Sequence, residues 1–171
     1  MRLTSVVLSA ALFLGVALPS AVLPSVAPAL AAAEFPVLKV TVGQTGQVRE
    51  IAFDRAGLEA VGTRIVRTST SWTNGIVEFE GVLITDVLAT IGADAVKSVR
   101  VAAINDYSYT IPFKDVKDYP VILAFKMNGK YLTARDKGPL WVIYPRDEYP
   151  ELNTKEVDHR MVWQVNAMTV Q

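Results

Sequence analysis

Beyond residue 33, short apolar runs alternate with turn residues, which is the pattern of a domain rich in short strands. Gly43 and Gly46 separate the first two runs and predict a hairpin. Asn128-Gly129 predicts a tight turn, because this pair tolerates positive φ at both central positions. In the last run the apolar phase switches after Ala167, which predicts a bulge. The runs expected to be strands are residues 37–42, 48–53, 64–70, 99–103, 107–112, 121–127, 140–144 and 161–170.

Two segments have helical spacing instead. Residues 55–61 are expected to form a helix that Asp54 caps and Gly62 ends. A second helix is expected after Thr85 as its cap, with Gly92 at its stop position. Many strands with two or three short helices predict an α+β domain of mixed and mostly antiparallel strands.

Residues 1–33 have the features of a signal peptide, which leaves residues 34–171 as a single domain. Arg2 supplies the positive start, residues 6–18 the apolar segment, and small residues allow cleavage after Ala31 or Ala33. A membrane anchor is the alternative, but it needs about 20 consecutive apolar residues. Prolines interrupt this run at Pro19, Pro24 and Pro28.

The expected location is therefore periplasmic or secreted. The segment lacks paired arginines, which favours the general secretory route over twin-arginine export. The general secretory route moves unfolded chains, whereas a protein that carries a cofactor assembled in the cytoplasm needs the other route.

Charge and cysteine content exclude several function classes. The 17 basic residues balance the 17 acidic ones, which argues against nucleic acid or an anionic membrane surface as partner. The chain has no cysteine, which excludes thiol catalysis, iron–sulfur clusters and thiolate zinc sites.

Five short strings follow one another over the second half of the chain. They are residues 79–83 leading into 86–88, residues 109–112, 124–132, 138–140 and 162–165. In this order they resemble the molybdopterin-binding domain of the sulfite oxidase family, from about residue 76 to 170. The resemblance implies the fold of that domain, a pterin-shaped pocket and relatives that are oxidoreductases.

The departures from the family concern the metal. Family enzymes carry a molybdenum-binding cysteine ahead of the Gly-Val-Leu segment, where this chain has only hydroxyl side chains and Trp72 between Arg67 and Thr73. Neutral hydroxyls are poor substitutes for a soft thiolate. Trp141 stands where the family enzymes place an arginine that suits anionic substrates. The chain thus resembles a small secreted subgroup, of which some members bind a pterin without metal and act as ligand-responsive partners.

Trp72 and Thr73 lie where the metal ligand would be, and an indole face can stack on a flat pterin ring. A packed core tryptophan is the alternative.

In Asn105-Asp106-Tyr107, the aspartate could accept hydrogen bonds from the 2-amino group and N3–H of a pterin, and the asparagine could donate to the 4-oxo group. An ordinary Asn-Asp turn is the alternative.

Arg135, Asp136 and Lys137 form the densest charge cluster, at the position of the family's cofactor-binding loop, and would suit a polyanionic tail. Solvated surface charge is the alternative. Arg160 and Trp163 lie near the expected pyranopterin site and are further candidates for ligand contact.

Other candidates for catalysis are weak. His159 is the sole histidine and supports no catalytic triad. Asp147, Glu148 and Glu151 are interpreted as a solvated loop rather than as a glycosidase pair.

The preferred hypothesis is a periplasmic, non-catalytic protein that binds a pterin or molybdopterin-like ligand without molybdenum. Its expected partner is the periplasmic domain of a membrane signalling enzyme. The alternatives are a molybdopterin-dependent oxidoreductase, or a subunit of one, and a purely structural partner.

Overall fold

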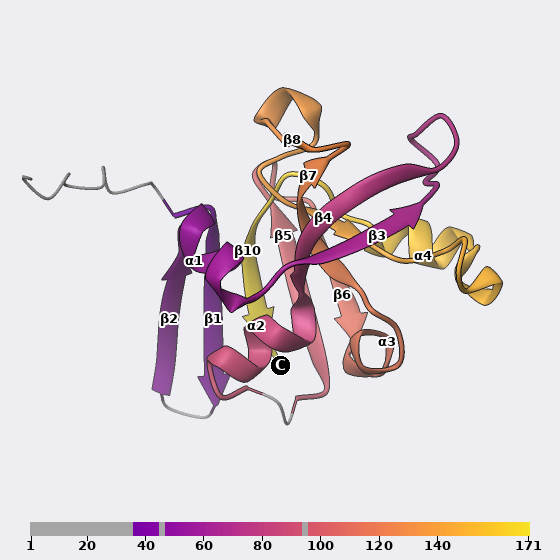
Figure 1. Cartoon of the computed structure of the whole chain (residues 1–171). Helices are drawn as coiled ribbons and strands as arrows, with labels where there is room; N and C mark the ends of the chain where they lie inside the picture. The colour runs from indigo at the N-terminus through magenta and orange to yellow at the C-terminus, as the bar shows by residue number, and fades with distance from the viewer. Residues whose placement is uncertain (1–35, 45–46, 94–95) are drawn as a thin grey trace, which may run out of the picture. The chain divides into compact units, whose positions relative to one another are not determined.

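The computed structural model describes residues 36–44, 47–93 and 96–171 as two five-stranded sheets with short helices (Figure 1). The fold is the α+β fold expected from the strand pattern, and it is consistent with a molybdopterin-binding domain. The predicted signal peptide, residues 1–33, lies outside the described residues. Among the helices in the described part of the chain, none is long and apolar enough to cross a membrane.

The first sheet has the strand order β2-β1-β10-β5-β6, and among its described strands only β1 and β10 pair in parallel. Its strands are β1 (Leu38–Gln44), β2 (Gln47–Phe53), β5 (Ser98–Ala103), β6 (Ser108–Pro112) and β10 (Val165–Val170). β1 and β2 pair along their whole length, which confirms the predicted hairpin. In β5, Val99, Val101 and Ala103 are buried, as their alternation predicts.

The second sheet runs β3-β4-β7-β8, with β9 also paired to β7. Its strands are β3 (Arg64–Thr68), β4 (Val77–Leu83), β7 (Ile122–Met127), β8 (Lys130–Tyr131) and β9 (Trp141–Ile143). Asn128 and Gly129 join β7 to β8 with φ of 50° and 75°, which confirms the predicted turn. A bridge between Leu140 and Val165 connects the two sheets.

The helices are α1 (Arg55–Val61), α2 (Ile84–Thr90), α3 (Phe113–Asp118) and α4 (Lys155–Arg160), with single 3-10 turns at Ala134–Asp136 and Pro150–Leu152. The Asp54 side chain accepts a hydrogen bond from the Gly57 N–H, and Gly62 follows α1 with φ of 130°, as predicted.

The prediction that Thr85 caps α2 is wrong. β4 runs directly into α2 through Leu83, and the buried Ile84 already belongs to the helix. Gly92 then has φ of 68° just beyond the helix, which confirms the predicted stop.

The last strand begins at Val165, four residues later than its alternation predicts. α4 ends at Arg160, and the chain then crosses the core as an irregular segment that turns at Gln164, where φ is 55°. The register shift between Val165 and Ala167 confirms the predicted bulge. The segment 161–164 is therefore free of strand pairing and can form one side of a cavity.

Both sheets contribute to one hydrophobic core. Its largest fully buried side chains include Trp141, Tyr144, Phe79 and Phe125. Trp141 donates its indole N–H to the carbonyl of Met161 at 3.0 Å, so the irregular segment is tied to the core at its first residue.

Candidate functional site

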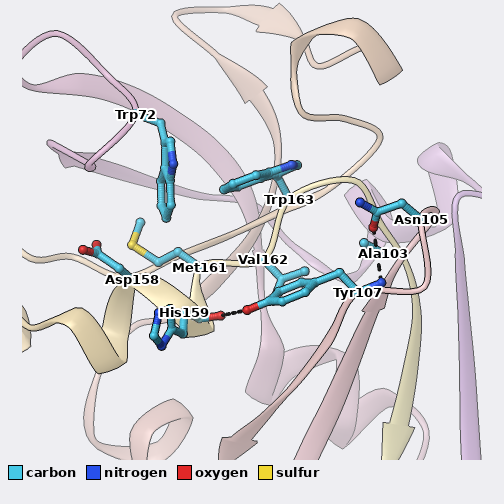
Figure 2. Close-up of a pocket in the computed structure, with 9 residues that line it drawn as sticks. All are labelled: Trp72, Ala103, Asn105, Tyr107, Asp158, His159, Met161, Val162 and Trp163. Carbon is cyan, nitrogen blue, oxygen red and sulfur yellow. Dashed lines mark hydrogen bonds between the residues drawn. The ribbon is translucent and has the colours of Figure 1, made fainter.

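A cavity of about 310 Å³ opens beside the irregular segment 161–164 (Figure 2). Its size is at the lower end of the range for small-molecule sites, about 300–1,000 Å³. Its walls come from the loop after β3, the turn between β5 and β6, and the end of α4. The lining residues are Trp72, Ala103, Asn105, Tyr107, Asp158, His159, Met161, Val162 and Trp163.

Aromatic rings form much of the wall. The Trp72 and Trp163 ring centroids lie 4.7 Å apart with their planes at 73°, an edge-to-face pair. Figure 2 shows these two rings on one side of the cavity, with Tyr107, Val162 and Met161 on the other. Trp72 is 38% exposed and Tyr107 is 47% exposed, so both stand at the mouth rather than in the core. The arrangement can receive a flat apolar ring from solvent.

The loop that carries Trp72 is held by hydrogen bonds at its base. Asp147 accepts hydrogen bonds from the hydroxyls of Thr68 and Ser69, both at 2.8 Å, and from the Ser69 N–H. The N–H of Ser69 is the main reason that the pKa of Asp147 lies below its usual range. The loop of Asp147, which the sequence predicted to be solvated, is therefore hydrogen-bonded to the Trp72 loop, although Asp147 itself remains exposed.

Asp158 connects this loop to α4. One carboxylate oxygen lies 2.6 Å from Nη1 of Arg146, and the other accepts the Ser71 hydroxyl at 2.8 Å. Arg146 also donates to the side chain of Asn153. Trp72 is therefore positioned by a carboxylate on each side of its loop, Asp147 and Asp158.

Asn105 and Tyr107 line the cavity, but Asp106 between them does not. Asp106 is exposed at a turn position with φ of 65°. The N–H of Tyr107 donates to the side-chain oxygen of Asn105 at 3.3 Å, which leaves the Asn105 amide group free to donate. Thr73 also lies outside the lining, and its hydroxyl bonds within its own loop to Thr70.

The charge cluster lies beside the cavity rather than in it. Arg135 and Asp136 are exposed, and Asp136 accepts the Thr133 hydroxyl at 2.8 Å. Lys137 places its ammonium group 4.7 Å from the ring centroid of Trp163 and 5.3 Å from that of Trp141. Lys137 thus contacts the site through a cation–π interaction with one of its walls.

Arg160 lies outside the lining and is bound by carboxylates. Its guanidinium contacts Asp115 at 2.6 Å and Glu156 at 3.1 Å, and the Tyr144 hydroxyl donates to the same Asp115 oxygen at 2.9 Å. Burial raises the pKa of the Tyr144 hydroxyl, so it stays a donor at any physiological pH. This network fixes α4 to α3 and to the start of the loop after β9.

Sequence reasoning placed Trp72, Asn105, Tyr107 and Trp163 in the site, and the structure brings these four together. It did not include the further lining residues, which are Ala103, Asp158, His159, Met161 and Val162. The signal that could have found them is adjacency. Three of the five, His159, Met161 and Val162, directly flank the candidates Arg160 and Trp163, and Asp158 is two positions before Arg160, where α4 gives way to irregular chain.

The residues present do not fit a thiolate-bound molybdenum. The chain has no cysteine, and the loop in question offers hydroxyls that are already hydrogen-bonded within the protein. In residues 36–44, 47–93 and 96–171, no group of three or more His, Asp or Glu side chains could hold a metal ion. The cavity is lined mainly by aromatic and aliphatic side chains, with Asn105, Asp158 and His159 as its polar groups.

Residues 51–158 match a family model described as the oxidoreductase molybdopterin binding domain. The match covers more than half of the chain, from within β2 to Asp158 in α4. No curated protein matches the chain.

Proposed function

The chain belongs to the oxidoreductase molybdopterin-binding domain family, and from that premise we propose that it is a non-catalytic protein that binds a pterin without molybdenum. The observation that carries the proposal is the aromatic cavity of Trp72, Trp163 and Tyr107 in a chain that has no cysteine. A family member with no thiolate to bind the metal has kept a cavity suited to the ring.

The pterin is a flat bicycle that lies between the indole of Trp163 and the side of the cavity formed by Tyr107 and Val162. Stacked aromatic pairs contribute about 0.5–1.5 kcal/mol beyond the area that they bury. The Lys137 ammonium against Trp163 holds that indole in place. Binding therefore rests mainly on ring burial, with polar groups at the rim to orient the ligand.

The protein then reports the ligand to a partner, the periplasmic domain of a membrane signalling protein. Trp72, Tyr107 and Ile104 are 38%, 47% and 52% exposed and lie at or next to the cavity. A ligand seated there changes the surface that these side chains present, so a partner that touches this surface senses occupancy. The N-terminal segment directs export by the secretory route and is removed by cleavage after Ala31 or Ala33.

Calorimetric titration with a tetrahydropterin tests the binding. We expect saturable binding that Tyr107→Leu weakens about tenfold, because the variant removes one aromatic wall. The matched control is Tyr131→Leu, since Tyr131 is also an exposed tyrosine, at 42%, but lies outside the cavity. Equal affinities in the two variants would remove the cavity from the proposal, and the absence of any saturable signal would remove the pterin.

The export part of the proposal has a separate test. Protein recovered from the periplasmic fraction should have the mass of a chain that begins at residue 32 or 34. A chain that retains residues 1–33 and stays in the cytoplasm contradicts export and the proposed partner, but not the binding site.

A further inference from the structure

Among the described residues that line the cavity, Asp158 carries the only carboxylate. Figure 2 places it at one end of the cavity and Asn105 at the other. The remaining lining side chains are aromatic or aliphatic, apart from His159. The two ends therefore offer different chemistry, which can orient a ligand that slides in between the rings.

The Asp158 carboxylate is held in place before any ligand arrives. Arg146, whose side chain is 11% exposed, contacts one oxygen, and Ser71 donates to the other. A carboxylate offers about four acceptor positions. With one protein donor on each oxygen, each keeps capacity for one more hydrogen bond. A pre-positioned group of this kind costs little to order on binding.

We propose that Asp158 determines which ligand edge the cavity accepts, by taking two parallel hydrogen bonds from a ring N–H and an adjacent exocyclic amino group. This inference rests on the proposed pterin function. In a 2-amino-4-oxopteridine, N3–H and the 2-amino group form such a pair of donors. In a 2,4-dioxopteridine, a carbonyl replaces the amino group and would face the carboxylate oxygen with no proton between them. Asp158 therefore selects the amino form.

Asp158 takes the role that sequence reasoning gave to Asp106. Asp106 lies outside the lining, on an exposed turn, whereas Asp158 reaches the cavity and is fixed there. Figure 2 shows Asn105 at the end of the cavity opposite Asp158, so the two side chains face different ends of a ligand. Its free amide group is placed instead for the far end of the ligand, where pterins carry their substituent.

The test is calorimetric titration of the intact mature protein with two probes, pterin and lumazine, which differ in the group at position 2 and in the proton that its carbonyl form places on N1. We expect the wild type to bind pterin at least about tenfold more tightly, because a site built for a donor rejects an analogue without it. In Asp158→Asn, the carboxamide presents one acceptor and one donor, which matches lumazine. The preference should then disappear or reverse. Asp106→Asn is the matched control and should keep the wild-type ratio.

The possible results separate the role of Asp158 from pterin binding itself. A wild type that binds both probes equally, or an Asp158→Asn protein with the wild-type ratio, overturns the role of Asp158 but leaves pterin binding intact. A wild type that binds neither probe overturns the proposed function itself. Asn105→Ala should weaken both probes by the same factor, because it acts at the other end of the ligand.

If Asp158→Asn fails to fold, Ser71→Ala serves instead, because it removes the hydrogen bond to one oxygen of the Asp158 carboxylate. This variant should lower the preference for pterin over lumazine, and an unchanged ratio of the two affinities counts against the proposal.

Guanosine presents the same pair of donors on a different ring system. Weaker binding of guanosine than of pterin supports a pterin as the ligand, and tighter binding contradicts it.

Discussion

Trp72 is the residue at which ligand binding is easiest to follow. Its ring lines the cavity in edge contact with Trp163 and is partly exposed. We expect a bound tetrahydropterin to quench tryptophan fluorescence, and Trp72→Phe to lose a large part of that quenching. Trp141 is fully buried and supplies a background that both proteins share. If the quenching is the same in Trp72→Phe, Trp72 does not contact the ligand.

Asp147 gives a prediction with a definite pH dependence. Its folded-state pKa lies below the ordinary value of 3.8, chiefly because the Ser69 N–H donates to it. A carboxyl with a lowered pKa stabilises the fold above its unfolded pKa, and this contribution is lost as the pH falls through the folded pKa. Asp147→Asn should therefore melt at a lower temperature than wild type at pH 7, since hydrogen bonds to a charged acceptor are stronger than neutral ones.

The difference between Asp147→Asn and wild type should shrink as the pH falls below 3.8, where the wild-type carboxyl becomes neutral as well. Asp106→Asn is the control, because Asp106 is exposed at a turn. Its melting temperature should match that of wild type throughout. A melting difference for Asp147→Asn that is constant from neutral to acid pH would show that the carboxylate charge does not anchor the loop.

Single residues were predictable where their chemistry is unusual for their surroundings. Trp72, Tyr107 and Trp163 are large aromatic side chains among polar neighbours, and all three line the cavity. Asp106 was chosen for its carboxylate, but it lies on an exposed turn with positive φ and outside the cavity lining. Asp158 lies in an ordinary run of charged residues, and its fixed place comes from the ion pair with Arg146 and from the Ser71 hydroxyl, which the sequence does not reveal.

At the scale of elements, the sequence predicted those parts that local signals define. The hairpin of β1 and β2, the capped helix α1 and the Asn-Gly turn each carry their signal within a few residues. The last strand was predicted too long because alternation reports burial and not pairing. Met161 is buried while the chain is still irregular, so it continues the pattern without belonging to the sheet.

Helix α4 is too short for its pattern to stand out, and its position depends on Arg160. The Arg160 and Asp115 side chains are 18% and 15% exposed. We expect Arg160→Met to lower the free energy of unfolding by about 2–3 kcal/mol in urea denaturation. This loss of stability is smaller than the loss expected for a fully buried ion pair, because both side chains remain partly exposed to solvent. Lys114→Met, which breaks the pair with Asp118 at a side chain that is 81% exposed, should have no measurable effect.

The same Arg160→Met protein separates the two roles that this residue could have. A loss of stability with ligand affinity retained in the folded fraction supports the structural role. Wild-type stability with lost affinity would instead favour the ligand contact expected from the sequence.

At the scale of the whole molecule, the fold does not depend on the residue type that ligates the metal. Two sheets and their helices build the family fold from apolar patterning that tolerates many side chains. The metal-binding cysteine that the resemblance implies is one side chain, and its absence from this sequence leaves the described core intact. The fold could therefore be inferred from the pattern of the chain, whereas its function had to be argued from the residues around one cavity.

Protein purified from cells grown with molybdate should contain far less than one molybdenum atom per chain by elemental analysis, because the chain has no cysteine to ligate the metal. A molybdenum-containing member of the same family, purified in parallel, is the control for metal lost during purification. One molybdenum per chain would mean that the cofactor is held without a protein thiolate. The proposal of a metal-free binding protein would then fall, and a molybdopterin-dependent oxidoreductase would take its place.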